Sequence, residues 1–124
     1  MNLNHVADMF KLIGERTRFR IVHLLIKRGE LCVQTLQQAL RQPQAKISRH
    51  LFVLRSSGFV NSRRQGQMIM YSLPESMNEH QQMLLSCINE HYANLPELKQ
   101  DLDFFDKLDN QGVLCCREHN KPVK

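Results

Sequence analysis

The feature that most limits the fold is Pro43, which separates two short helical patterns near the middle of the chain. Before it, residues from Val33 to Leu40 have helical spacing, with Leu36 and Leu40 on the inner side. After it, a helix is predicted from Gln44 to about Ser57, because proline disfavours helix at the preceding residue and is tolerated at a helix start. Two short helices joined by so brief a break predict a helix–turn–helix.

A hairpin pattern follows this unit directly. Apolar residues partly alternate from Phe59 to Leu73, Gly66 lies in the middle, and Pro74 closes the segment. Alternation around a central glycine is typical of two strands joined by a turn. Arg63 and Arg64 make that turn basic. A basic hairpin placed after a helix–turn–helix is the arrangement of a winged helix.

Helical spacing predicts four further helices around this centre. The expected fold is mainly α with a small β-hairpin: two helices, the two helices of the helix–turn–helix, the two wing strands, then two terminal helices. We expect a winged-helix part in residues 1–94, and a C-terminal helix with a cysteine-bearing tail in residues 95–124. The four further helices are expected at about residues 4–13, 17–28, 75–94 and 97–108.

Charge divides the 124 residues into two unlike parts. Twelve Lys and Arg face only two Glu between Lys11 and Arg64, whereas five Lys and Arg face nine acids from Gln65 onward. Such asymmetry indicates a polyanionic partner for the first part, since the helix–turn–helix lies within it.

The sequence also bears on where the protein resides. No run of apolar residues reaches the roughly 18 needed to cross a membrane. Because the first residues also lack a signal-peptide pattern, we expect a cytoplasmic protein without a membrane partner, in a compartment where thiols stay reduced.

The predicted helix after Pro43 has two faces. Ile47, Leu51 and Leu54 form the anchoring side, and the opposite face is polar apart from Ala45 and Phe52. Gln and Arg pair with the edges of adenine and guanine, and Ser reaches a base or a phosphate. Hairpin arginines suit phosphates or the minor groove. The predicted contacts with double-stranded DNA are Gln44, Ala45, Ser48 and Arg49 in the helix, Arg63 and Arg64 in the hairpin, and Lys46 and Arg18 at phosphates. The alternative is that these are ordinary solvated helix faces.

Several strings together resemble the ArsR/SmtB family of metal-sensing repressors, and in particular its arsenic-responsive branch. The resemblance covers about residues 3 to 93. It implies a homodimer formed through the terminal helices, which binds an inverted-repeat operator in the apo form and releases it when an inducer binds. The strings that carry it are Gly14–Arg18, Gly29–Val33, Gln42–Leu51, Leu54–Gly58 and Tyr71–Leu73.

The sequence departs from that branch at the helix before the recognition helix. The arsenic branch often carries three cysteines there, whereas the string Cys32–Gln37 keeps only the first. The usual three-thiolate site cannot form, so an inducer site must lie elsewhere or draw on other cysteines.

The remaining cysteines offer such a site, because three thiolates suit As(III) or Sb(III). Cys115 and Cys116 are adjacent, and a third thiolate would come from Cys32 or, less favoured, from Cys87; the pair alone suits an organoarsenical. Cys32 directly precedes a predicted helix and so lies at its N-terminus, where a thiol pKa is lowered, although a small buried residue would also serve there. Cys87 shares an apolar stripe with Leu84 and is better interpreted as an interface cysteine.

Other functions remain open at this stage. His80 and His91 fit a zinc site across a dimer less well than they fit an interface or surface role. A repressor that senses redox state through a disulfide, a sensor of cadmium, lead or zinc, and a pure protein-interaction module are the alternatives. The chain lacks Cys-X-X-Cys and a glycine-rich nucleotide loop, so we expect no enzyme, no catalytic residue and no catalytic cofactor.

Overall fold

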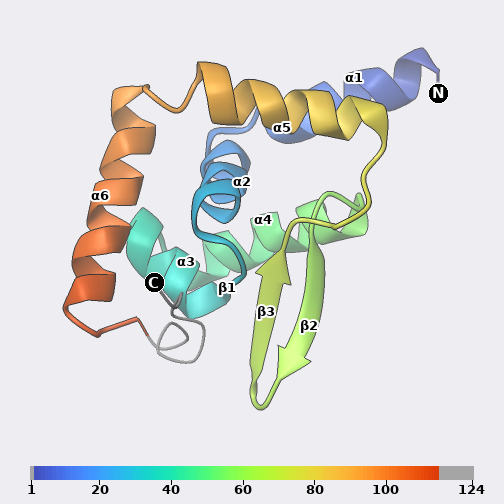
Figure 1. Cartoon of the computed structure of the whole chain (residues 1–124). Coiled ribbons are helices and arrows are strands. Elements are labelled where there is room, and N and C mark those ends of the chain that lie inside the picture. Colours follow the sequence, from blue (N-terminus) through green and yellow to red (C-terminus); the bar gives the residue numbers. More distant parts are fainter. Residues whose placement is uncertain (1, 115–124) are drawn as a thin grey trace.

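The computed structural model describes residues 2–114. The described helices and strands follow the predicted order, with one short strand added (Figure 1). The helices are α1 (Leu3–Ile13), α2 (Arg16–Arg28), α3 (Val33–Leu40), α4 (Gln44–Ser56), α5 (Glu79–His91) and α6 (Pro96–Asn110), and the strands are β1 (Leu31–Cys32), β2 (Asn61–Gln65) and β3 (Met68–Ser72).

The helix–turn–helix consists of α3 and α4, joined at Arg41 to Pro43. Arg41 adopts the left-handed conformation, with φ 57° and ψ 46°, and so turns the chain sharply after α3. Pro43 precedes the first residue of α4, and its carbonyl accepts hydrogen bonds from the backbone amides of Lys46 and Ile47. The predicted start of this helix at Gln44 is therefore confirmed.

One hydrophobic core holds these elements together around α2, which packs against α1, α4, α5 and α6. Ile47, Leu51 and Leu54 of α4 are fully buried in it, as predicted. In Figure 1, α5 extends across one end of α2, and α6 descends along α2 and α3. Phe105 of α6 is also fully buried in this core. Residues 96–110 thus share the core of the winged-helix part.

The wing is a sheet of three strands in the order β1-β3-β2. Gly66 has φ +62° in the tight turn between β2 and β3, a conformation that favours glycine. The third strand, β1, pairs along the other edge of β3, with Cys32 opposite Met70. The predicted hairpin is confirmed, but β1 is an addition, because two residues are too short to show an alternating pattern.

The boundaries of α5 differ from the prediction of residues 75–94. The helix begins at Glu79 because Asn78 caps it: the Asn78 side chain accepts from the backbone of Gln81, and the Gln81 side chain accepts from the backbone of Asn78. This reciprocal capping fixes a helix start at Asn78. The helix ends at His91, and the chain then turns into α6. Among residues 2–114, no helix is both long and apolar enough to cross a membrane.

His23 is an unusual buried group in this core. It is fully enclosed on α2, and neither ring nitrogen has a hydrogen-bond partner among the described residues. Burial lowers its pKa from 6.5 to about 4, and the nearby positive charge of Lys27 acts in the same direction. The fold therefore accepts the neutral imidazole and disfavours the protonated form.

Acidification should consequently weaken the fold through His23. Below pH 6.5 the unfolded chain gains a proton that the folded chain does not bind until about pH 4, so the free energy of unfolding falls by up to about 3 kcal/mol over this range. Urea unfolding at several pH values should show a weaker pH dependence in His23→Leu than in the unsubstituted chain. The exposed His5 supplies the control, since His5→Gln should keep the full dependence. An unchanged pH dependence in His23→Leu would contradict this account.

Candidate nucleic-acid interface

The outward face of α4 carries the residues that the sequence predicted for base contacts. Gln44, Ala45, Ser48 and Arg49 are all exposed, while the anchoring side of the helix is buried. Phe52 extends this outer face by one turn and is 67% exposed. A polar, solvent-facing side on a helix whose other side is fixed in the core is the geometry that a DNA recognition helix requires.

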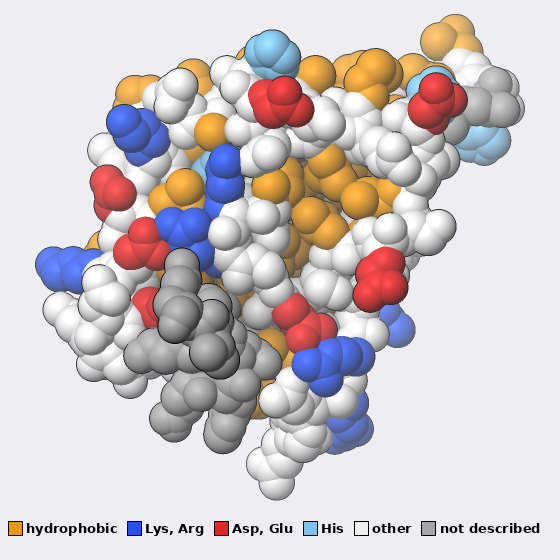
Figure 2. Space-filling view, in the orientation of Figure 1, with side chains coloured by type: hydrophobic (Ala, Val, Ile, Leu, Met, Phe, Trp, Pro, Cys, Tyr) orange, Lys and Arg blue, Asp and Glu red, His pale blue; other side chains and the backbone are white. Residues whose placement is uncertain are grey.

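The two hairpin arginines differ in their surroundings. The guanidinium of Arg63 donates to both carboxylate oxygens of Glu30, at 2.7 and 2.6 Å, and also to Gln65. The hydrogen bond to Glu30 raises the pKa of Arg63. Arg64 donates only a 3.2 Å bond to the carbonyl of Gly66 among the contacts described. Figure 2 shows Lys and Arg side chains over this hairpin, with an acidic side chain beside them. Glu30 was not anticipated as a partner.

Arg18 lies inward of the surface that the sequence predicted for it. Its Nε donates to the carbonyl of Leu12 at 2.7 Å, and its Nη1 lies 3.2 Å from Nδ1 of His50 on α4. Burial lowers the pKa of His50, although the carboxylate of Glu15 opposes this effect. Arg18 thus connects the end of α1 with α4. Its contact with a phosphate stays a prediction, as does that of Lys46, whose Nζ donates to Gln42.

The cysteines are spread over distinct surroundings. Cys32 is fully buried at the junction of β1 and α3; its Sγ lies 3.4 Å from Thr35 Oγ1 and it packs against Met70. Cys87 is half-buried on α5. Cys115 and Cys116 lie outside the residues that the structure describes. Within residues 2–114, no group of three His, Cys, Asp or Glu side chains is placed to hold a metal ion, and this includes His80 and His91.

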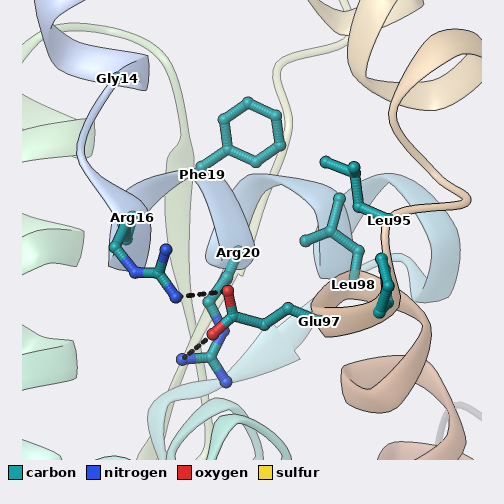
Figure 3. Close-up of a pocket in the computed structure, with 8 residues that line it drawn as sticks. Gly14, Arg16, Phe19, Arg20, Leu95, Glu97 and Leu98 are labelled. Atoms are coloured by element: carbon teal, nitrogen blue, oxygen red, sulfur yellow. Dashed lines mark hydrogen bonds and ion pairs between the residues drawn. The ribbon is translucent and has the colours of Figure 1, made fainter.

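A hollow of about 460 Å³ lies where α2 meets the start of α6. Phe19, Leu95 and Leu98 give it apolar walls (Figure 3). At its edge, the carboxylate of Glu97 accepts a 2.5 Å hydrogen bond from Arg16 and lies 4.0 Å from the guanidinium of Arg20. These ion pairs join the start of α6 to α2.

Known proteins are similar to this chain in sequence. Residues 15–62 match the bacterial regulatory proteins of the arsR family. Over 110 residues, the chain is 42% identical to the arsenic resistance transcriptional regulator ArsR2 of Pseudomonas putida KT2440, covering 88% of this chain and 96% of that protein. The chain belongs to the arsR family. It is therefore a regulatory protein and not an enzyme, as the sequence predicted.

This arsR-family chain is also similar to one further relative in sequence and to another in structure. It is 51% identical over 66 residues to the arsenical resistance operon repressor of Escherichia coli K12, a match that spans 53% of this chain and 56% of that protein. Its structure resembles the transcriptional repressor BigR of Xylella fastidiosa, with a TM-score of 0.64 and 32% identity over 74% of this chain and 88% of that one. The expected winged-helix fold is thereby confirmed.

Proposed function

We propose that this arsR-family chain is a homodimeric transcriptional repressor that binds an inverted-repeat operator when ligand-free. Trivalent arsenic or antimony, or an organoarsenical, releases the DNA by binding cysteine thiolates. The observation that carries the proposal is the exposed face of α4 beside the basic hairpin, on a chain that is 42% identical to an arsenic resistance regulator over nearly its whole length.

DNA reading is assigned to α4 and the wing. Gln44, Ser48 and Arg49 project from the exposed face of a helix that the core holds in place. Arg49 suits a guanine edge and Gln44 an adenine edge, while Ala45 suits a thymine methyl. Arg64 of the hairpin is available for phosphate, whereas Arg63 must first exchange Glu30 for the DNA. Lys46 and Arg18 complete the predicted phosphate contacts.

The sequence predicted dimerisation through the terminal helices; we assign it to one of them, α5, together with α1, both within residues 1–94. The two helices are neighbours, because Met9 and Leu12 of α1 line the same cavity as Gln81 of α5. Both carry large apolar side chains in solvent, including Phe10 on α1 and Met83 on α5. Exposed apolar groups that gather on adjacent elements are typical of a protein–protein interface.

The inducer site is assigned to Cys115 and Cys116 with Cys32 as the third thiolate, and with Cys87 as the alternative. Soft sulfur ligands suit trivalent arsenic and antimony. Cys32 directly precedes α3, so a bond to its Sγ would act on the helix–turn–helix itself. Because Cys32 is fully buried, an arsenical reaches it only when the β1–α3 junction opens.

Substitutions in α4 and in the wing should affect DNA binding differently. Arg49→Ala should weaken binding to a duplex selected from a random pool by roughly 5- to 150-fold and relax its sequence preference, since it removes a base contact of about 1–3 kcal/mol. Arg64→Ala should weaken selected and unselected duplexes alike and reduce the salt slope by about one. Fluorescence anisotropy measures both. Lys99→Ala, which removes a charge from the exposed side of α6, should leave binding nearly unchanged.

Arsenite and phenylarsenite should release the reduced protein from the selected duplex. We expect Cys115→Ser and Cys116→Ser to bind DNA normally yet resist release by arsenite, and one of Cys32→Ser and Cys87→Ser to do the same. Undiminished release from both Cys115→Ser and Cys116→Ser would reject the tail site. Release that needs peroxide rather than arsenicals would select redox sensing instead, and release only by cadmium, lead or zinc would select a different metal sensor.

A further inference from the structure

A buried carboxylate joins α6 to the turn of the helix–turn–helix. The Asp101 side chain is fully buried and accepts two hydrogen bonds from Arg20, from Nε at 2.9 Å and from Nη2 at 2.8 Å. Its Oδ1 also accepts a 2.5 Å bond from Nη2 of Arg41. One carboxylate on α6 therefore holds one guanidinium from α2 and another from the turn. Bidentate pairs of this kind fix orientation as well as distance.

Arg41 is the residue that sets the turn between α3 and α4. It is the one non-glycine residue with positive φ among residues 2–114, and such residues need support from their surroundings to hold that conformation. Here the support comes from α6, because the guanidinium also lies over the ring of Phe104, 4.9 Å from its centroid. Arg20 adds a 3.0 Å hydrogen bond to the carbonyl of Leu40, the last residue of α3. The end of α3 is thus held from two sides.

We propose that Asp101 is a positioning residue for DNA binding: by holding Arg41 and Arg20, it fixes the angle at which α4 leaves α3. This inference rests on the proposed function. Cys115 and Cys116 follow the end of α6 at Asn110 in the sequence, so a ligand on the proposed inducer site would have α6 as its connection to α4.

The negative charge of Asp101 makes the direction of the affinity change in Asp101→Asn informative. Removing a negative charge from a DNA-binding protein should, by electrostatics alone, strengthen binding to every duplex. Loss of a positioning contact should instead weaken binding to the selected duplex, where α4 must meet the base edges at a fixed angle, and spare unselected DNA. The two accounts of Asp101→Asn therefore predict opposite changes in affinity.

Asp106 supplies a matched control on the same helix. Its carboxylate accepts two hydrogen bonds from Arg28, at 2.9 and 2.7 Å, and so joins α6 to α2 much as Asp101 does. Arg28 is the last residue of α2 and lies outside the turn between α3 and α4. Asp106→Asn removes the same charge from α6 but leaves Arg41 and Asp101 in place.

The experiment measures anisotropy with the selected duplex and with an unselected duplex of equal length over a range of salt concentrations. We expect Asp101→Asn to lose roughly 5- to 150-fold in affinity for the selected duplex, the range typical of coupled sites. Its binding to the unselected duplex should be at least as tight as that of the unsubstituted chain, and Asp106→Asn should bind both duplexes at least as tightly as the unsubstituted chain. Circular dichroism at the working temperature establishes that each variant is folded.

Arg41→Gln removes the bond between Arg41 and Asp101 without disturbing the pair between Asp101 and Arg20. If Asp101→Asn does not fold, Arg41→Gln tests the positioning role in its place. It should lose affinity only for the selected duplex, and the double variant should be no weaker than the weaker single variant. A salt slope reduced by about one in Arg41→Gln would show a phosphate contact instead.

Tight binding by folded Asp101→Asn would overturn the inference and leave the proposed function standing. If the unsubstituted chain selected no duplex at all, the proposed function itself would fail.

Discussion

The position of the candidate base contacts depends on the burial of one side of α4. Ile47, Leu51 and Leu54 are fully enclosed by the core, and truncating one such leucine or isoleucine to alanine costs about 2–5 kcal/mol. A small domain has only about 5–15 kcal/mol of stability in total. The contacts that fold the chain therefore also aim the outer face of α4, and whatever moves the core elements beneath it also moves that face.

Local patterns in the sequence were enough to predict α4 and which of its sides is buried. Pro43 marked the start of α4, and the spacing of its apolar residues identified the buried side. The missing parts were pairings between distant residues: Arg63 and Glu30 are 33 positions apart, and Arg41 and Asp101 are 60 apart. Periodicity reports which face of one element is buried, but it carries no information on which charges meet after folding.

The unequal charge of the two parts of the chain has two physical roles: some arginines of the first part pair with acids of the second, and the others are left for DNA. Four of the twelve Lys and Arg in the first part pair with acids of α6 in the second, since Asp101, Glu97 and Asp106 accept hydrogen bonds from three arginines of α2 and one of the turn. The arginines left for DNA are fewer than the sequence suggests, and they include Arg49 on α4 and Arg64 on the wing. The acidic part thus shapes the basic surface by neutralising arginines of α2 and of the turn between α3 and α4.

The contacts between α6 and the turn also affect how an inducer can release DNA. Direct binding to Cys32 requires the junction of β1 and α3 to open, because the thiol is fully enclosed. A ligand on the C-terminal segment needs no such opening if α6 transmits its effect to Arg41. A coupling of only about 1–3 kcal/mol changes affinity by 5- to 150-fold, which is comparable to the range for a buried hydrogen bond to a charged group, about 1.5–3 kcal/mol. Loosening the contacts around Asp101 is therefore sufficient in magnitude to release DNA.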